Sequence, residues 1–195
     1  MQGAPQQYMP NHAVMSSDRC MYVTYSTNPG PQTMTDGGVW KYDIVSDTWT
    51  DITPDKPTAD RRFGYVSVSV DLKNPNHIIA STFGRPMSGQ SSAEDIFRST
   101  DGGKTWKGVF AEGGYYDEAK APYVIHTGIH WLFDIEIDPF NSDHAMFTTG
   151  YGGWETFNLS AMDKDEPTKW EVMSTGIEET VPLELYSPVE GAWLI

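Results

Sequence analysis

The chain has 195 residues, of which 38% are hydrophobic and 13% aromatic, a composition typical of one folded globular domain. Thirteen Lys and Arg against 27 Asp and Glu give a formal net charge of −14. A surface this acidic repels phosphate backbones and anionic lipids, so we expect neither nucleic acid nor a membrane as a partner. The single cysteine, Cys20, cannot form an internal disulfide, and no spacing of Cys and His resembles a metal site. We therefore expect no metal and no cofactor.

The chain is expected to consist of β-strands in groups of four. Alternation in residues 65–71 and 133–139 places every second side chain on one face of a strand. Gly, Pro, Asn and Asp recur too often for a convincing helix. We expect strands near residues 12–17, 20–26, 38–45 and 48–53, near 65–71, 77–83, 95–100 and 104–110, and near 133–138, 144–150, 154–159 and 169–174. Two further runs, 183–189 and 192–195, are expected to begin a fourth group.

Internal repeats define the architecture. The stretches "VDLKNPNHIIAST" (70–82) and "IDPFNSDHAMFTT" (137–149) share Asp, Asn and His at matching positions. "GVWKYDIVSDTWTDI" (38–52) pairs with "DIFRSTDGGKTWKGV" (95–109), and a looser copy places Trp170 where these have Trp49 and Trp106. Four-stranded units that recur every ~50–65 residues predict the blades of a β-propeller. A β-sandwich is the alternative all-β fold, but it needs no internal repeat.

One polar turn, "STDGGKTW" (99–106), combines an acid, two glycines and a tryptophan between two expected strands. An Asp accepts backbone N–H groups in such a turn, Gly supplies positive φ, and Trp packs beneath. The stretch resembles the Asp box of sialidase-like propellers, which lies on the face away from the active site. The residues that match it, which we expect to be structural, are Ser99, Asp101, Gly103, Thr105 and Trp106.

A longer series of motifs carries a family resemblance. The stretches "YMPNHAVMSSDRCMYVTYSTNPGP", "DGGVWKYDIVSDTWTDITP", "VSVDLKNPNHIIAS", "DIFRSTDGGKTW", "HWLFDIEIDPFNSDHAMFTTGYGGWET" and "GIEETVPLELYSP" occur in this order. Together they resemble the later blades of the first propeller in glycoside hydrolase family 74, a family of xyloglucanases, endoglucanases and oligoxyloglucan-specific cellobiohydrolases.

The resemblance implies an all-β fold of four-stranded antiparallel propeller blades. The chain would correspond to an internal stretch of about three and a half blades of an incomplete seven-bladed propeller. Residues 1–176 would form its later blades, near 12–53, 65–110 and 133–174. Residues 177–195 would form a connection and the first strands of a following blade.

The resemblance also implies an activity: hydrolysis of β-1,4-glucan backbones of the xyloglucan type, with inversion. Inversion needs two carboxyl groups about 6.5–9.5 Å apart, and in the family one aspartate comes from each of two sister propellers. The resemblance places one aspartate in a segment near the start of the first propeller and the other shortly after Ile195, so neither is expected within this chain. Asp36 in "TDGGVW" imitates such a segment, but its neighbours align with the loop after "YVTYS". The chain alone is therefore expected to be inactive. A secreted or periplasmic location is implied, although residues 1–12 show no secretion signal.

The alternative is a non-catalytic Asp-box propeller that binds carbohydrate or protein through the same face. No His has a recognisable spacing to a Ser, so a serine hydrolase is not expected.

A glucan-facing surface is expected at one end of the blades, in loops near residues 1–11, 27–37, 54–64, 84–94, 111–132 and 151–153. Aromatic rings in such loops stack on the apolar faces of sugars, although half or more of them would simply pack the blades. The candidates for substrate binding are Trp131, His130, Tyr115, Tyr116, Tyr151 and Trp154, with Tyr123 as a further aromatic. Trp131 is the strongest, because the family has a Trp where this loop enters an inner strand. Loop 84–94 lacks the paired tryptophans of many members, and its Arg85 either bonds sugar hydroxyls or is simply solvated.

Overall fold

The structure, a computed structural model, describes residues 5–28, 34–86, 94–120, 122, 131–150 and 152–173, and it is nearly all β-sheet. In each of its three sheets, four strands follow one another in the order of the chain. The strands of the first sheet are β1 (Met9–Met15), β2 (Cys20–Ser26), β3 (Gly37–Asp43) and β4 (Thr48–Asp51). Those of the second are β5 (Gly64–Val70), β6 (Ile78–Phe83), β7 (Ile96–Ser99) and β8 (Lys107–Gly108). Those of the third are β10 (Ile135–Ile137), β11 (Ala145–Thr149), β12 (Gly152–Thr156) and β13 (Lys169–Val172).

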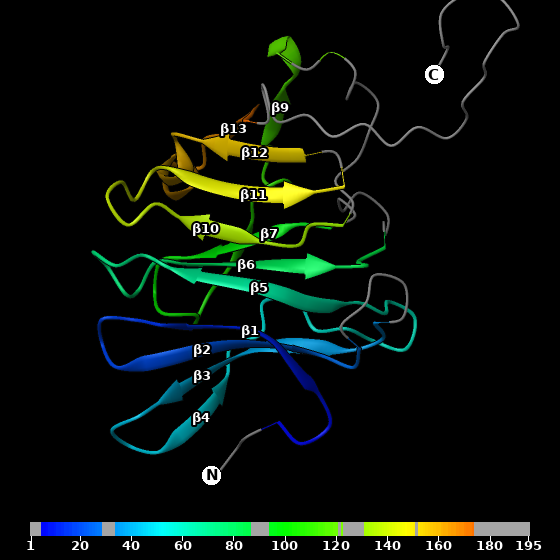
Figure 1. The fold of residues 1–195 in the computed structure, drawn as a ribbon, viewed down its shortest axis with the longest axis vertical. Helices are drawn as coiled ribbons and strands as arrows, with labels where there is room; N and C mark the ends of the chain where they lie inside the picture. The colour runs from blue at the N-terminus through cyan, green and yellow to red at the C-terminus, as the bar shows by residue number, and fades with distance from the viewer. Residues whose placement is uncertain are drawn as a thin grey trace, which may run out of the picture.

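The sheets lie side by side, with β5 between β1 and β10 (Figure 1). Within each group of four, neighbouring strands pair antiparallel. The expected all-β fold with four-stranded antiparallel units is thus confirmed, and each strand lies within a few residues of its expected position. The fourth group expected at 183–195, like the connection before it, lies outside the described residues.

Two apolar layers hold the sheets together. Between the first and second sheets, Tyr22 and Val39 pack with Phe63 and Tyr65, and all four side chains are fully buried. A second layer joins the second and third sheets around the fully buried Trp170. Because every sheet buries apolar side chains against a neighbour, the sheets stabilise one another by removing this area from water.

The repeated Asp, Asn and His build the same turn twice. Its members are Asp71, Asn74 and His77 between β5 and β6, and Asp138, Asn141 and His144 between β10 and β11. In each turn the backbone N–H of the Asp donates to the backbone carbonyl of the His, at 3.0 and 2.9 Å. The His N–H donates to the Asn carbonyl, at 2.9 and 3.0 Å. Each Asp carboxylate also accepts the N–H two residues further on. The repeat is therefore a turn signature.

Three elements differ from the expected pattern. A short strand, β9 (Tyr115–Asp117), pairs parallel with β13 and makes the third sheet five-stranded. A 3₁₀ helix, η3 (Leu159–Lys164), fills the turn between β12 and β13, and a second one, η1 (Glu118–Lys120), follows β9. Leu159 and Met162 of η3 are buried against the third sheet. No helix among the described residues is long and apolar enough to cross a membrane.

Candidate carbohydrate-binding face

The starts of β1, β5 and β10 lie at one end of the sheets, together with the ends of β2, β6 and β11. This end is on the right in Figure 1 and carries the arrowheads of β6 and β11. The Asp-box turn lies at the opposite end, where the Gly102 N–H donates to the Asn76 carbonyl of the β5–β6 turn at 3.0 Å. The two ends therefore have separate chemistry, and the first is the candidate carbohydrate-binding face.

The polar groups of the Asp-box turn bond to one another. Asp101 Oδ1 accepts the N–H groups of Lys104 and Thr105 at 3.0 and 2.9 Å, and Oδ2 accepts the Thr105 hydroxyl at 2.6 Å. These bonds, led by those from Thr105, lower the pKa of Asp101 to about 2. Gly103 has φ of +89°, and a Cβ there would lie 2.8 Å from Ile52 Cδ1. The arrangement is that of a scaffold turn.

Trp131 projects from the candidate face because its neighbour is anchored. Glu94, which is 5% exposed, accepts the N–H of Leu132 through Oε2 and the N–H of Gly84 through Oε1, each at 2.8 Å. Leu132 itself is fully buried. Trp131 has φ of +55°, which is unusual for a residue with a Cβ, and is 42% exposed. Because backbone outliers cluster at functional sites, Trp131 stays a candidate for sugar binding.

A second exposed ring follows Trp131. Phe133 is 47% exposed and packs on the buried Phe83, with ring centroids 4.8 Å apart. The packing holds Phe133 in place while leaving part of the ring open to solvent. No sequence pattern singles out Phe133, since its place in an alternating run gives it the appearance of an ordinary strand residue.

Arg85 packs under this face. Its side chain is 7% exposed and forms an ion pair with Asp55 at 3.0 Å, and the same carboxylate oxygen accepts a bond from Arg61. The Arg85 guanidinium also lies 5.9 Å from the centre of the Phe63 ring and 5.5 Å from that of Phe97. The expectation that Arg85 is solvated or reaches sugar hydroxyls is therefore corrected, because burial and Asp55 occupy its charged head.

The remaining aromatic candidates divide into three groups. Trp154 is 3% exposed and lies 4.3 Å from the ring of Tyr116, whose pKa burial raises. Both rings pack the third sheet, so we do not carry them forward as sugar-binding residues. Tyr115 is 49% exposed, but it lies on the edge strand β9, opposite Lys169 of β13. The other candidates, His130, Tyr151 and Tyr123, lie outside the described residues.

Asp36 also lies at the candidate face, beside a hollow lined by Thr35, Asp36, Pro57, Thr58, Ala59 and Arg62. Its Oδ2 accepts the hydroxyl of Tyr8 at 2.8 Å, and its Oδ1 accepts the Gly37 N–H at 2.8 Å. Burial, followed by this hydrogen bond, raises the pKa of Tyr8 to about 12. The geometry gives Asp36 a clear role in fixing the loop between β2 and β3, and we assign it no catalytic role.

The fold brings together one Ser, one His and one Asp that the sequence separates widely. Ser67 Oγ donates to Asp134 Oδ1 at 2.7 Å and lies 3.3 Å from His12 Nδ1. In a hydrolytic triad the His stands between the Ser and the Asp and removes the serine proton. Here the Ser stands in the middle, so its proton is held by the carboxylate. This arrangement is therefore not that of a hydrolytic triad.

The fold and the face define a β-propeller protein that carries an Asp-box turn on one end and aromatic rings on the other. No protein-family model matches the chain. It is 37% identical to the xyloglucanase Xgh74A of Acetivibrio thermocellus, over 99% of this chain and 25% of that protein. It is 32% identical to the oligoxyloglucan-reducing end-specific xyloglucanase of Emericella nidulans, over 93% of this chain and 28% of that protein.

A solved structure, that of the GH74 xyloglucanase from Xanthomonas campestris, matches with a TM-score of 0.82 and 36% identity, over 98% of this chain and 27% of that one. The GH74 enzyme of Niastella koreensis matches with a TM-score of 0.73 and 30% identity, over 85% of this chain and 24% of that one. The chain is thus a relative of the xyloglucanases of glycoside hydrolase family 74, matched over nearly its whole length. It spans about a quarter of the length of these relatives.

Proposed function

We propose that the protein acts in xyloglucan breakdown, as part of a glycoside hydrolase that cleaves β-1,4-glucan backbones. The observation that carries this proposal is the agreement in sequence and fold with xyloglucanases along nearly the whole chain. The exposed Trp131 and Phe133 at one end of the sheets support it, because aromatic faces stack on glucose rings. A secreted or periplasmic location belongs to the same proposal, since xyloglucan is a polymer outside the cell.

In this proposal the described blades bind the glucan, and the reaction takes place on residues outside the chain. An inverting hydrolase uses one carboxylic acid to protonate the leaving oxygen and one carboxylate to activate water. We propose that a sister propeller forms the opposite wall of the cleft and that each propeller supplies one aspartate. Trp131 would hold a glucose unit near that wall, with Glu94 fixing its position through Leu132.

The test compares binding with hydrolysis. The 195-residue chain is run through native gels that contain xyloglucan, unsubstituted β-1,4-glucan or dextran, and reducing ends are measured after incubation with each polymer. We expect retardation by xyloglucan, none by dextran, and no release of reducing ends. A full-length relative serves as the positive control for hydrolysis.

Two results would overturn parts of the proposal. Absence of retardation by xyloglucan would contradict glucan binding by this face. Release of reducing ends by the chain alone would contradict the placement of both catalytic aspartates outside it. A non-catalytic propeller remains the second candidate, and it would be favoured if a longer product of the same gene bound xyloglucan without cleaving it.

A further inference from the structure

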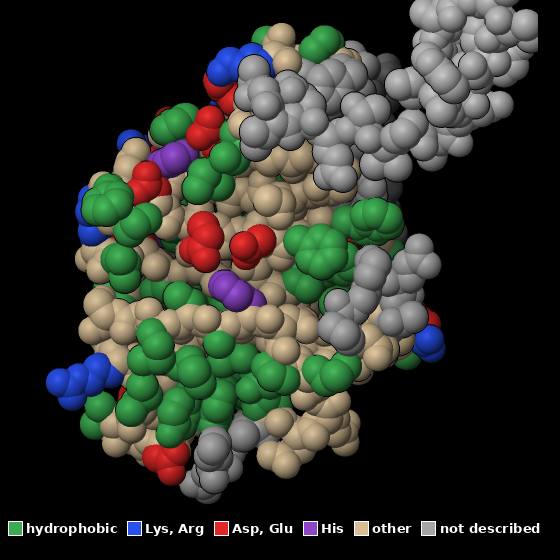
Figure 2. All heavy atoms as spheres, in the orientation of Figure 1, with side chains coloured by type: hydrophobic (Ala, Val, Ile, Leu, Met, Phe, Trp, Pro, Cys, Tyr) green, Lys and Arg blue, Asp and Glu red, His purple; other side chains and the backbone are tan. Residues whose placement is uncertain are grey.

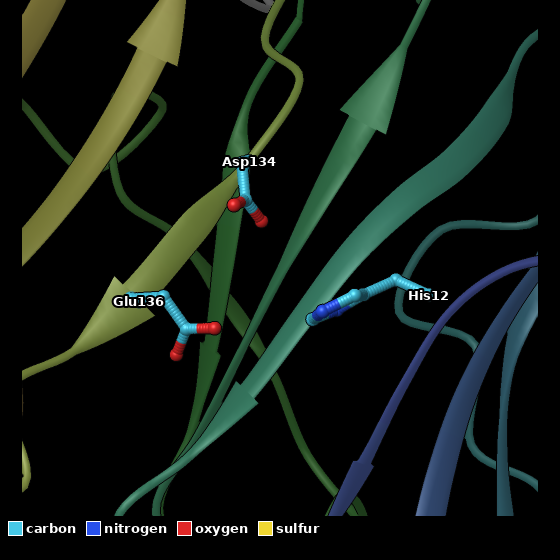
Figure 3. A group of neighbouring side chains, drawn as sticks. All are labelled: His12, Asp134 and Glu136. Atoms are coloured by element: carbon cyan, nitrogen blue, oxygen red, sulfur yellow. The ribbon is translucent and has the colours of Figure 1, made fainter.

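A cluster of polar side chains lies on the strands that begin the three sheets. Figure 2 shows a histidine and two acidic groups gathered on the face that the first strands of the sheets form. Figure 3 identifies them as His12 on β1, with Asp134 just before β10 and Glu136 on it, and shows the imidazole pointing toward both carboxylates. Their ligand atoms all lie within 4.8 Å of one another.

The two carboxylates share one side of the chain because residues i and i+2 of a strand face the same way. Serines of β5 hold one oxygen of each: Ser67 donates to Asp134 Oδ1 and Ser69 to Glu136 Oε2, both at 2.7 Å. The same serines accept the backbone N–H groups of Ile135 and Ile137 at 3.3 and 3.0 Å, which fixes β10 against β5. The carboxylates are thereby oriented before any ligand arrives.

The negative charges of this pair lack a fixed counter-charge. Among the described residues, neither Asp134 nor Glu136 forms an ion pair with a Lys or Arg. Two carboxylates on one face repel each other, and a cation between them relieves the repulsion. Within the part of the chain that the structure describes, the metal-binding group grouped with both carboxylates is the His12 imidazole. The set of one imidazole nitrogen and two carboxylate oxygens is one that zinc accepts.

The contacts of His12 suit metal binding. Nδ1 lies 3.3 Å from Ser67 Oγ and 3.4 Å from the Val68 nitrogen. A protonated Nδ1 can donate to Ser67, and an unprotonated Nδ1 can accept the Val68 N–H. With the proton on Nδ1, the ring donates to Ser67 and its Nε2 lone pair is open. Metal-bound histidines characteristically donate their other N–H in this way. Ser67 would then support two ligands at once, because it also bonds Asp134.

We propose that His12, Asp134 and Glu136 form a zinc site that ties the first sheet to the third across β5. Ligands about 2.0–2.2 Å from a tetrahedral zinc lie ~3.5 Å apart, so the ligand atoms, now within 4.8 Å of one another, come into range by rotation of the two exposed carboxyl side chains. Because His12 and the carboxylates come from different sheets, a bound Zn²⁺ would lock the relative positions of three sheets. The proposal does not depend on glucan binding.

A second histidine between two carboxylates provides an internal comparison. His144 bonds Asp138 through Nδ1 at 2.9 Å and Glu155 through Nε2 at 3.0 Å. Both ring nitrogens are engaged and the carboxylates lie on opposite sides of the ring, so no single point lies near all three. A variant at Glu155 therefore removes a carboxylate beside a histidine without touching the proposed site.

The experiment titrates the metal-stripped chain with Zn²⁺, Ca²⁺ and Mg²⁺ by calorimetry and follows thermal unfolding with and without each ion. We expect one Zn²⁺ per chain, weaker binding of Ca²⁺ and Mg²⁺, and a higher Tm with Zn²⁺. Glu136→Gln keeps the side-chain shape and an acceptor for Ser69, and we expect it to weaken Zn²⁺ binding about tenfold or more. His12→Gln should do the same, whereas Glu155→Gln should bind as the unmodified chain does.

Three results would overturn the proposal. These are no Zn²⁺ binding to the unmodified chain, unchanged affinity in Glu136→Gln, and Ca²⁺ binding as tight as Zn²⁺, which would exclude a histidine ligand. Circular dichroism of the metal-free variants verifies folding, and Glu136→Gln decides the test if His12→Gln does not fold.

Discussion

The carboxylate of Glu94 accepts the backbone N–H of Leu132 at 2.8 Å, across 38 residues of chain. This bond joins a residue just before β7 of the second sheet to the residues that lead into β10 of the third. Because its other oxygen holds the Gly84 N–H at the end of β6, Glu94 sets the position of the loop that carries Trp131. A buried acid far from Trp131 in sequence thus governs the most exposed tryptophan of the candidate face.

Replacing this acid tests its positioning role. Glu94→Gln removes one of the two acceptor oxygens and leaves a buried N–H without its partner, which costs about 1–3 kcal/mol of unfolding free energy. We expect a lower urea midpoint and weaker xyloglucan binding, with Trp131 itself unchanged. Urea unfolding followed by fluorescence, together with affinity gels, measures both. Unaltered stability would show that Glu94 does not hold this loop.

The Asp-box turn should matter for stability and not for glucan binding. Asp101→Ala removes an acceptor of several turn hydrogen bonds, which typically costs about 1–2 kcal/mol. We expect a lower Tm and unchanged retardation by xyloglucan. Asp60→Ala, at an exposed acid in another loop, serves as the control and should leave Tm unchanged. Loss of glucan binding in folded Asp101→Ala would refute the structural assignment.

The same carboxylate predicts an acid dependence of stability. Its pKa is lowered from 3.8 to about 2 in the folded chain. A carboxyl group with a lowered folded pKa stabilises the fold above its unfolded pKa, and this contribution is lost as pH falls from near 3.8 through about 2. The difference in Tm between the unmodified chain and Asp101→Ala should therefore shrink over that range. A constant difference would contradict the lowered pKa.

His144 predicts the opposite dependence near neutrality. Burial opposes its charge, but hydrogen bonds to Asp138 and Glu155 prevail and raise its pKa above 6.5. Its contribution is complete below 6.5 and is lost as pH rises through the raised folded value. Urea midpoints of the unmodified chain and of His144→Gln should converge as pH increases from 6 to 9. Midpoints that diverge with rising pH would contradict this sign.

Much of the fold was predictable because its signals are local. The turn built by Asp71, Asn74 and His77 recurs with the same residues in the third sheet, so the repeat located both strand pairs. Alternation matches the burial of β10, where every second side chain faces the core, whereas β5 is buried along its whole length. The edge strand β9 was missed, because three residues that pair in parallel with a strand more than fifty residues away leave no local pattern.

The candidate face was only partly predictable. Trp131 stood out as an aromatic at the entry of an inner strand, and the structure exposes it. Tyr116 and Trp154 were also candidates in sequence, but Trp154 is buried in the third sheet and Tyr116 is partly buried against the same core. The cluster around His12 was missed because its partner Ser67 lies 55 residues away and Asp134 a further 67. Only the packing of three sheets brings these residues together.

Xyloglucan binding through Trp131 is the central proposal, and calorimetry with a xyloglucan oligosaccharide tests it directly. We expect Trp131→Ala to weaken binding about tenfold or more, equivalent to ~1.4 kcal/mol. Phe140→Ala is the matched control, because Phe140 is an 86% exposed ring in the β10–β11 turn at the opposite end. It should bind as the unmodified chain does. Equal affinity of Trp131→Ala and the unmodified chain, or equal losses in the two variants, would contradict the central claim.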